Sequence, residues 1–424
     1  MKILSCYVNE MAITVNRVEV SPFRKLNSPI RKIHYSGVRT KDYEFHFNLK
    51  GEIKMIRGLG MNWPHPYNWL KRSDGNDWVY YRTGNVAKRQ VLKFFGEYYL
   101  PCLSYQSNQI FEFNPYTDPA VAAALAAWSQ LYANLYGTNT DDLKPEIRDF
   151  IKSVIKNGED VLHQNAKDFH EITGGRISVL PPDARHVNYD VVPVMISEGC
   201  IYNCKFCYVK SKKKFNSFSK DKITTQIDAL KSFYGENIIN YSGLFLGNHD
   251  GLFAEFETIE MAANASYKEF GFEKHSVRPA MFLFGSVESF LRSDTKTLEG
   301  LNNLPYHTYI NIGLESFDKE TLDLLGKPLS PSLNKEVFEK MVEVNRNYEN
   351  IEITANILLS EDFSENHNNS VIEMLNSVKE KTNKGGVYFS PMVNNLDRVK
   401  SLDTFFDIKN QVSYPAFTYL IQRL

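Results

Sequence analysis

Short runs of apolar residues alternate with longer amphipathic segments over the second half of the chain. The runs are VVPVMI (191–196), SGLFLG (242–247), PAMFLFG (279–285), TYINIGL (308–314), IEITANILL (351–359) and GVYFSP (386–391). Uninterrupted apolar runs of this length are typical of strands buried on both faces, and the segments between them have a helical pattern. Right-handed strand–helix repeats predict an α/β fold, with a parallel sheet that curls into a full or partial (β/α)6 barrel.

The first part of the chain has a different pattern. Apolar and polar residues alternate in AITVNRVEV (12–20), YEFHFNL (43–49) and EIKMI (52–56), which predicts half-buried strands. Three of the four tryptophans lie between residues 61 and 82, among turn-forming residues. They suit either a stacking platform for a base, sugar or aromatic side chain, or hydrophobic core, and we favour core.

Helical patterns and a linker separate these two parts. An Ala-rich segment follows Pro119, and a second helical pattern covers 141–172. Paired Gly and paired Pro residues in 173–190 then indicate a linker. We therefore predict a β-rich recognition domain over 1–115, a helical connector and linker over 116–187, and the barrel with a C-terminal extension over 188–424.

Composition narrows the class of protein. Lys and Arg number 49 against 50 for Asp and Glu, a balance that disfavours nucleic acid as the main partner. The N-terminus shows no signal-peptide pattern, and the Ala-rich segment 120–137 contains polar residues that suit a core helix better than a membrane span. Five cysteines in 424 residues do not make a disulfide framework. We expect a soluble cytoplasmic protein that does not bind membranes.

Three of the five cysteines lie within eight positions, in EGCIYNCKFCY (198–208), where the first apolar run ends. Thiolates are soft ligands for zinc or for iron–sulfur clusters. Structural zinc needs four ligands, and no second cysteine pair is present. A cube of four irons held by three thiolates keeps one iron open for another ligand. Buried, unligated thiols are the remaining alternative.

Two further stretches complete a resemblance. The CxxxCxxC spacing with an adjacent aromatic, the strand-end stretch LFLGNHD (244–250) and INIGLESFDKETLDLLGKP (310–328) together resemble the radical S-adenosylmethionine (radical SAM) superfamily over residues 188 to 395. LFLGNHD lacks the Gly-Gly-Glu that many members have at this place.

The resemblance implies a [4Fe–4S] cluster on Cys200, Cys204 and Cys207, with S-adenosylmethionine on its open iron. It further implies reductive cleavage of S-adenosylmethionine to a 5′-deoxyadenosyl radical, which abstracts a hydrogen atom from a substrate. A reducing partner such as flavodoxin or ferredoxin would supply the electron. The lysine-rich run 210–214 favours a solvated face, and the alternative is an electropositive rim that binds a phosphate, a carboxylate or such a redox partner.

Other residues at strand ends are candidates for cofactor contacts. Each has a structural alternative: a turn, a helix cap, a satisfied polar group in the core or, for Tyr208, ordinary packing. The candidates are Tyr208, Gly247, Asn248, Asp250, Ser286, Glu288, Glu315, Ser316, Asn356 and Ser390.

Several functions are compatible with this sequence. We predict a radical SAM enzyme acting on a small or medium-sized substrate, without auxiliary clusters or cobalamin. The alternatives are a radical SAM enzyme that modifies a peptide, a protein or RNA, a non-catalytic iron–sulfur or zinc protein, and a metal-free interaction scaffold.

Overall fold

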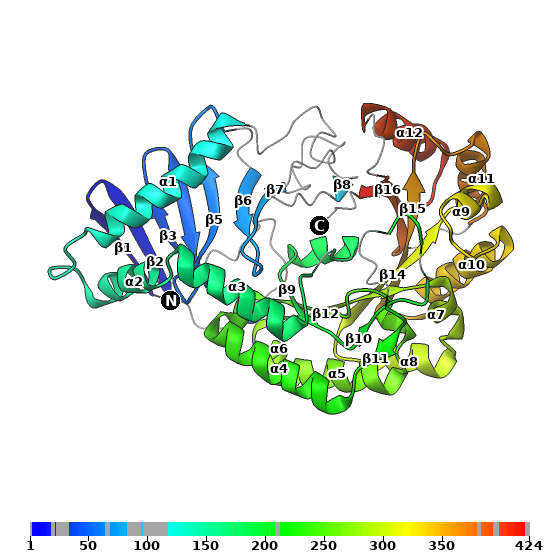
Figure 1. Ribbon diagram of the computed structural model, residues 1–424, viewed down its shortest axis with the longest axis horizontal. Coiled ribbons are helices and arrows are strands. Elements are labelled where there is room, and N and C mark those ends of the chain that lie inside the picture. Colours follow the sequence, from blue (N-terminus) through cyan, green and yellow to red (C-terminus); the bar gives the residue numbers. More distant parts are fainter. Residues whose placement is uncertain are drawn as a thin grey trace.

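A curved, wholly parallel sheet of eight strands forms the larger part of the computed structural model (Figure 1). The model describes residues 2–17, 22, 34–63, 68–82, 95–96, 118–177, 179–202, 204–207, 213–379, 383–392 and 398–419. In spatial order the strands are β9 (Val191–Val194), β12 (Gly243–Leu246), β13 (Ala280–Gly285), β14 (His307–Glu315), β15 (Ile351–Leu359), β16 (Gly386–Pro391), β17 (Ala416–Tyr419) and β8 (Phe95–Gly96).

The six predicted strands are confirmed as β9 and β12 to β16, in the predicted order. The sheet extends beyond them, because β17 pairs with β16 and the two-residue strand β8 pairs with β17. Strands β9 and β8 are the two edges of the described sheet, so the barrel is partial.

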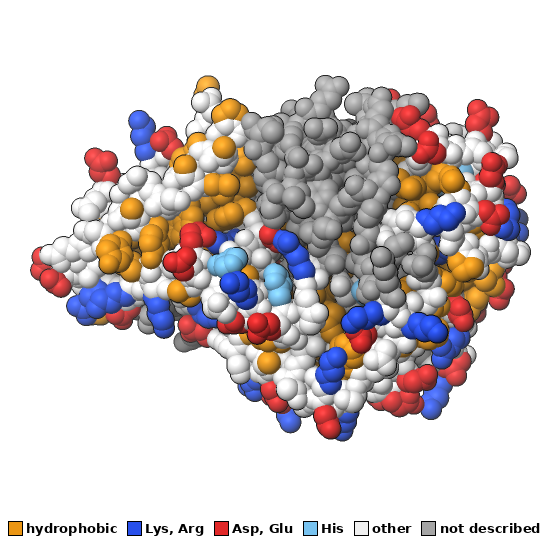
Figure 2. Space-filling model, viewed as in Figure 1, with side chains coloured by type: hydrophobic (Ala, Val, Ile, Leu, Met, Phe, Trp, Pro, Cys, Tyr) orange, Lys and Arg blue, Asp and Glu red, His pale blue; other side chains and the backbone are white. Residues whose placement is uncertain are grey.

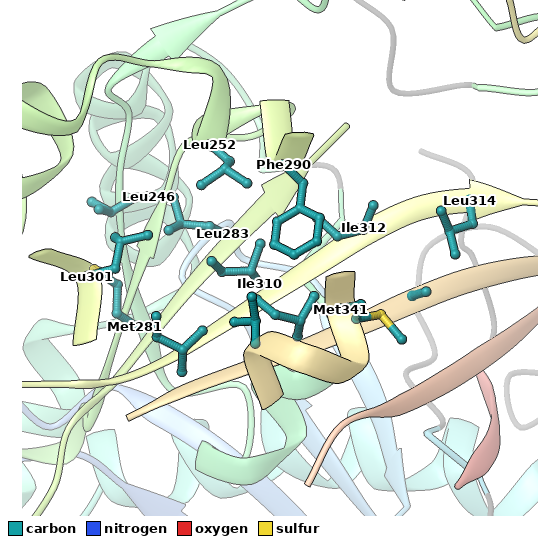
Figure 3. Close-up of a cluster of buried hydrophobic side chains, with 14 of the residues drawn as sticks. Leu246, Leu252, Met281, Leu283, Phe290, Leu301, Ile310, Ile312, Leu314 and Met341 are labelled. Carbon is teal, nitrogen blue, oxygen red and sulfur yellow. The ribbon is translucent and has the colours of Figure 1, made fainter. Parts of the chain in front are cut away.

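Helices cover the outer face of this sheet (Figure 1). They are α4 (Lys220–Tyr234), α5 (Phe256–Glu269), α6 (Phe272–His275), α7 (Val287–Arg292), α8 (Thr295–Asn303), α9 (Lys319–Leu324), α10 (Pro331–Asn347), α11 (Glu365–Asn376) and α12 (Arg398–Gln411). Figure 3 shows the core between the layers: Leu283, Ile310 and Ile312 of the strands lie among Phe290, Leu301 and Met341 of the helices. Strand residues that alternate with these face the barrel interior, where a site can form.

A separate antiparallel sheet of seven strands forms the N-terminal part, with its strands in chain order. They are β1 (Lys2–Val8), β2 (Met11–Arg17), β3 (Ser36–Arg39), β4 (Tyr43–Phe47), β5 (Ile53–Gly58), β6 (Asn68–Arg72) and β7 (Trp78–Arg82). Helices α1 (Pro119–Tyr136) and α2 (Pro145–Lys156) pack on this sheet through a shared hydrophobic core. The predicted β-rich and then helical N-terminal part is confirmed.

The helical pattern over 141–172 corresponds to two helices, α2 and α3 (Glu159–Thr173). The break comes at Gly158, where a Cβ atom would lie 2.6 Å from the hydroxyl oxygen of Tyr132 in α1. Helix α3 then links the two parts of the protein, because Leu162 belongs to the N-terminal core and Phe169 to the barrel core.

The tryptophans of the N-terminal part are mostly core residues. Trp63 and Trp69 are buried, and the Trp63 indole donates a hydrogen bond to the Asn68 carbonyl over 2.8 Å. Trp128 is buried against the sheet. This burial favours the core interpretation over a stacking platform.

A partly buried polar cluster joins the N-terminal sheet to the barrel. Asp74, in the turn between β6 and β7, accepts hydrogen bonds from Lys54 (2.9 Å) and from the hydroxyls of Tyr234 (3.0 Å) and Tyr241 (2.7 Å). The two tyrosines belong to the barrel side of the contact, so this carboxylate ties the two parts together.

The predicted linker enters the barrel. It contains the 3₁₀ helix η5 (Pro182–Val187), in which Asp183 and Ala184 are fully buried. Ala184 packs in one cluster with Phe245 and Phe282, residues that point inward from β12 and β13. The linker therefore fills one end of the barrel interior. Short elements complete the described fold: η6 (Gly235–Asn240), η7 (Gly251–Phe253), β10 (Ser197–Glu198) and β11 (Asn216–Ser217).

The surface carries both charges. Figure 2 shows basic and acidic side chains interspersed over the helices that cover the parallel sheet. Within the described residues, no helix has the length and hydropathy needed to cross a bilayer.

Candidate functional site

One cavity of about 200 Å³ gathers most of the candidate residues. It lies where the parallel strands end, the place where loops build sites in such folds. Eight of the sequence candidates line it: Cys200, Cys204, Cys207, Asn248, Asp250, Ser286, Glu315 and Asn356. The sequence separates these residues by up to 156 positions, and the strand order brings them together.

The cysteine loop is held at both ends. The ribbon β10–β11 closes its base, and the Cys200 amide donates to the carbonyl of Lys213. Gly199 has a φ of 78°, and a Cβ atom there would lie 2.3 Å from the carbonyl oxygen of Lys214. At the far side, the Lys205 amide donates to the Leu325 carbonyl over 2.9 Å. Only glycine fits at position 199 without moving the ribbon.

The three thiols share one electrostatic environment. Burial raises the pKa of Cys204 to about 11, while Lys327 lowers it and the other two cysteines and Glu315 raise it. Burial also raises the pKa of Cys200. The Cys200 and Cys204 thiols are therefore protonated at neutral pH in the absence of a cation, and binding of a metal cluster would release their protons.

Two oxygens beside the cysteines have no hydrogen-bond partner. Asp250 is buried, and its Oδ1 accepts from the Ser286 amide (3.0 Å) and the Ser289 hydroxyl (2.8 Å), while Oδ2 accepts from nothing. Oδ1 of Asn248 is likewise buried and unpartnered. Burial raises the pKa of Asp250. Unsatisfied buried acceptors that line a cavity suit a ligand that donates hydrogen bonds.

Gly247 makes the turn that presents these two residues. Its φ is 83°, and its amide donates to the Val194 carbonyl of the neighbouring strand over 2.9 Å. The lining of the cavity begins at the next residue, Asn248.

Glu315 ends β14 at a register shift in the pairing with β15, and has a φ of 68°. This conformation is rare for a residue with a side chain. The carboxylate forms a buried ion pair with Lys327, with 3.0 Å between Nζ and Oε1, and Lys327 also donates to the Gly313 carbonyl. Both residues line the cavity, so the pair places a carboxylate and an ammonium group beside the thiols.

Ser316 lies outside the lining and supports the turn. Its hydroxyl is 2.8 Å from Nδ1 of the buried His367, whose Nε2 is 2.9 Å from the Leu358 carbonyl. A carbonyl only accepts, so Nε2 carries the proton and Nδ1 accepts from Ser316. The Asn334 side chain donates to the carbonyls of Leu314 and Ser316. These contacts brace Glu315 from both sides.

Ser286 and Glu288 begin helix α7. Ser286 is its N-cap, and its hydroxyl accepts from the Ser289 amide over 3.0 Å in a capping box. Helix capping therefore accounts for the Ser286 hydroxyl, as the structural alternative expected, although the residue also lines the cavity. Glu288 is exposed, and its side chain is not part of the lining. Its backbone forms a hydrogen bond with Tyr202, which does line the cavity.

The remaining candidates lie on the last strands or outside the described residues. Asn356 of β15 lines the cavity, donates from Nδ2 to Oδ1 of Asn311 over 2.6 Å, and has an unpartnered Oδ1. Ser390 of β16 is buried with an unpartnered hydroxyl oxygen and is not part of the lining. Tyr208 lies outside the described residues.

Some lining residues were not singled out from the sequence. Lys327 belongs to the LLGKP stretch, but nothing in the pattern distinguishes its side chain from a surface lysine. Asn311 is a polar residue inside an apolar strand, so the reasoning applied to Asn356 could have found it. Tyr202 lies inside the cysteine loop, with its ring 5.9 Å from Lys327 Nζ.

Residues 194–375 match the family model described as Radical SAM superfamily. The chain carries a radical SAM domain. The match begins at the last residue of β9 and ends within α11, and it includes all eight candidates that line the cavity. It covers less than half of the chain, and the subfamily is not specified.

Solved structures of radical SAM enzymes resemble part of the chain. A methyltransferase from Sphaerobacter thermophilus is 13% identical, with 54% of this chain and 66% of that chain covered and a TM-score of 0.39. Methylornithine synthase is 10% identical, with 60% and 81% covered and a TM-score of 0.36. Coproporphyrinogen III oxidase from Escherichia coli is 12% identical, with 53% and 47% covered and a TM-score of 0.32.

The chain thus spans just under two thirds of the methyltransferase and about half of the oxidase. No curated protein matches the sequence.

Radical SAM enzymes use a [4Fe–4S] cluster and S-adenosylmethionine, and these are the cofactors of this domain. The chemistry of the donor set suits the cluster, because three cysteine thiols line one cavity and thiolates are its usual ligands. Among the residues that the structure describes, no three His, Cys, Asp or Glu side chains converge closely enough to hold one metal ion. A cube binds each thiolate at a different iron, so it accommodates thiols that are further apart than the ligands of a single ion.

Proposed function

We propose that the protein is a radical SAM enzyme that cleaves S-adenosylmethionine reductively and abstracts a hydrogen atom from a small or medium-sized substrate. The observation that carries this proposal is the composition of one cavity. Three thiols, three unpartnered acceptors and a buried Lys–Glu pair face the same space. Each of these groups has a counterpart on a cluster-bound S-adenosylmethionine.

Cys200, Cys204 and Cys207 would hold the cluster, which when bound supplies the electron that breaks the bond from sulfur to the 5′ carbon. The glycine turn at Gly199 and the Lys205 amide fix the loop that carries the thiols. Cys204 is buried, which limits the access of water to this thiolate.

The amino acid end of S-adenosylmethionine carries an ammonium and a carboxylate. Asp250 Oδ2 and Asn248 Oδ1 are acceptors that suit the ammonium, and they stand where many members have Gly-Gly-Glu. Lys327 is the cation in the lining that suits the carboxylate. The Ser286 amide and the Ser289 hydroxyl keep the other oxygen of Asp250 occupied, which aims Oδ2.

Contacts to the nucleoside are assigned to Glu315 and Asn356, which also line the cavity. Tyr208 stays a candidate for the same end. Gly247, Ser286, Glu288, Ser316 and Ser390 are proposed to act by shaping the strand ends.

We also propose that the domain boundaries lie at residues 115 and 187, and that the N-terminal part recognises the substrate. The electron donor is proposed to be an acidic protein such as flavodoxin or ferredoxin. Lys213 and Lys214 are exposed beside the cysteine loop, and Lys213 also pairs with Glu198 over 2.6 Å. A reduction rate that falls steeply with ionic strength is the expected sign of such docking.

The test is anaerobic reconstitution with iron and sulfide, then incubation with a reductant and S-adenosylmethionine. We expect about four irons per chain, bleaching by air, and 5′-deoxyadenosine as product. Replacement of Cys200, Cys204 or Cys207 by Ala should abolish cluster binding and 5′-deoxyadenosine formation, while Cys6→Ala, a matched change far from the site, should leave both intact. One zinc per chain would identify a zinc protein instead, and a full cluster without 5′-deoxyadenosine would leave only a non-catalytic iron–sulfur protein.

A further inference from the structure

Asp183 is a carboxylate buried inside the barrel at the end that the linker fills. It belongs to η5 and is fully buried. Each of its oxygens accepts from one hydroxyl: Oδ1 from Tyr388 over 2.7 Å, and Oδ2 from Thr354 over 2.8 Å. Neither Asp183 nor its partners line the cavity that contains the cysteines.

A chain of hydrogen bonds leads from Asp183 to that cavity. Thr354 Oγ1 accepts from Asn311 Nδ2 over 2.9 Å, and Asn311 Oδ1 accepts from Asn356 Nδ2 over 2.6 Å. Asn311 and Asn356 both line the cavity, and Oδ1 of Asn356 is buried with no partner. The chain therefore ends on an open acceptor.

Asp183 fixes the direction of every bond in this chain. An ionised carboxylate only accepts, so the single hydroxyl proton of Thr354 must point to it. Thr354 can then only accept from Asn311, which turns the amide nitrogen of Asn311 toward Thr354 and its oxygen toward Asn356. Asn356 must in turn donate to Asn311 and present its own oxygen to the cavity. The orientation of both amides follows from one anion.

We propose that Asp183 is a positioning residue that makes this wall of the cavity a hydrogen-bond acceptor, and that the group bound there is a donor of the S-adenosylmethionine nucleoside, a ribose hydroxyl or the adenine amino group. The inference rests on the proposed function. The same cavity contains the thiols, which suit the cluster, and Lys327 and Asp250, which suit the amino acid end of the cofactor. The nucleoside is the part of the cofactor that these residues leave without a partner, so we assign Asn356 to it.

The test uses the reconstituted holoenzyme and measures the dissociation constant of S-adenosylmethionine anaerobically. Thr354→Val removes the link and preserves side-chain volume, so the two amides are free to rotate, and we expect binding to weaken about tenfold. Tyr388→Phe is the matched control, because it removes the other hydroxyl on Asp183, which does not lead to the cavity. It should change the dissociation constant less than twofold.

A double-variant comparison separates positioning from general damage. Asp183→Asn should weaken binding in the wild type and have no further effect in the Thr354→Val background, because both act through the same link. Thr354→Ser keeps the hydroxyl and should restore wild-type affinity. If Thr354→Val fails to fold or to retain iron, Asn356→Ala at the cavity wall takes its place and should show the same loss.

Three results would overturn the inference: wild-type affinity in Thr354→Val, an equal loss in Tyr388→Phe, or additive losses in the double variant. If the wild type binds S-adenosylmethionine and forms 5′-deoxyadenosine while the variants do not differ, the inference alone fails. If the wild type binds none, the proposed function fails and takes the inference with it.

Discussion

Lys327 and Glu315 form a buried ion pair at the cavity that holds the three cysteines, with 3.0 Å between Nζ and Oε1. Lys327 comes from the turn after α9, and Glu315 from the irregular end of β14. The pair connects the end of β14 with the turn after α9. This turn also contacts the cysteine loop, because the Lys205 amide donates to the Leu325 carbonyl. One contact thus connects the strand end, the helix end and the loop.

Replacement of Lys327 by Met should leave Glu315 as an unpaired buried carboxylate. Breaking one half of a buried pair costs about 3–5 kcal/mol of unfolding free energy. We expect urea unfolding of the apoprotein to show a loss of this size, and the reconstituted variant to bind S-adenosylmethionine more weakly. The double variant Lys327→Met, Glu315→Gln removes both charges and should recover most of the stability. Wild-type stability in the single variant would show that the ion pair is not maintained in solution.

Gly199→Ala should prevent the cysteine loop from closing. The added Cβ would lie 2.3 Å from the Lys214 carbonyl oxygen, in addition to the strain of a φ of 78°. We expect the iron bound after reconstitution to fall by more than half, because the base of the loop must move.

Gly174→Ala is the matched control for this change. It has a similar φ of 72° with no atom within 4 Å of the new Cβ, so it imposes the strain of about 1 kcal/mol without the clash. Equal iron contents in the two variants would contradict the proposed role of Gly199.

The barrel strands could be predicted because parallel strands buried on both faces are apolar throughout, as SGLFLG and PAMFLFG are. Strands β17 and β8 could not be predicted in this way. Strand β17 has four residues and β8 has two, and their pairing joins segments more than 300 positions apart. Such a pairing is decided by tertiary packing and not by a local pattern.

The site was predictable where residue type carries the chemistry. Three clustered thiols and the polar residues at strand ends indicated the cavity. Asp183 gave no such indication, because a carboxylate in a Pro-rich linker has the pattern of a solvated turn. The burial of Asp183 depends on η5 entering the barrel. Its proposed positioning of Asn356 depends on Thr354 of β15 lying opposite Asn311 of the neighbouring strand β14. The role of Lys327 could not be predicted either, because its burial depends on the tertiary contact with Glu315.

Acid should destabilise the protein through His367. Burial lowers the pKa of this histidine from 6.5 to about 4, so the unfolded chain takes up its proton first as the pH falls. The stabilising contribution is present above pH 6.5 and is lost as the pH falls toward 4. Between pH 7 and pH 5 the wild type should lose about 2 kcal/mol more unfolding free energy than His367→Gln, whose amide can make both hydrogen bonds without titrating. Equal pH dependence of the two proteins in urea unfolding would contradict a neutral, buried His367.

Asp183 should have the opposite effect over the same pH range. Burial raises its pKa from 3.8 to about 6, with Glu352 adding to the shift and Tyr388, Thr354 and Arg185 opposing it. The folded protein therefore takes up this proton before the unfolded chain does. Its contribution to stability is fully present below pH 3.8 and is lost as the pH rises through 6.

Relative to Asp183→Asn, the wild type should gain about 1 kcal/mol of unfolding free energy between pH 7 and pH 5. Asp190, whose pKa burial also raises to about 6, is common to both proteins and cancels in the comparison. Urea unfolding of the two apoproteins at both pH values measures the difference. If the gap between them stays constant, Asp183 does not change its charge in this range. If the gap moves as expected, the protonated form below pH 6 can itself donate to Thr354, and the hydrogen-bond chain to Asn356 loses the fixed direction that the carboxylate imposes.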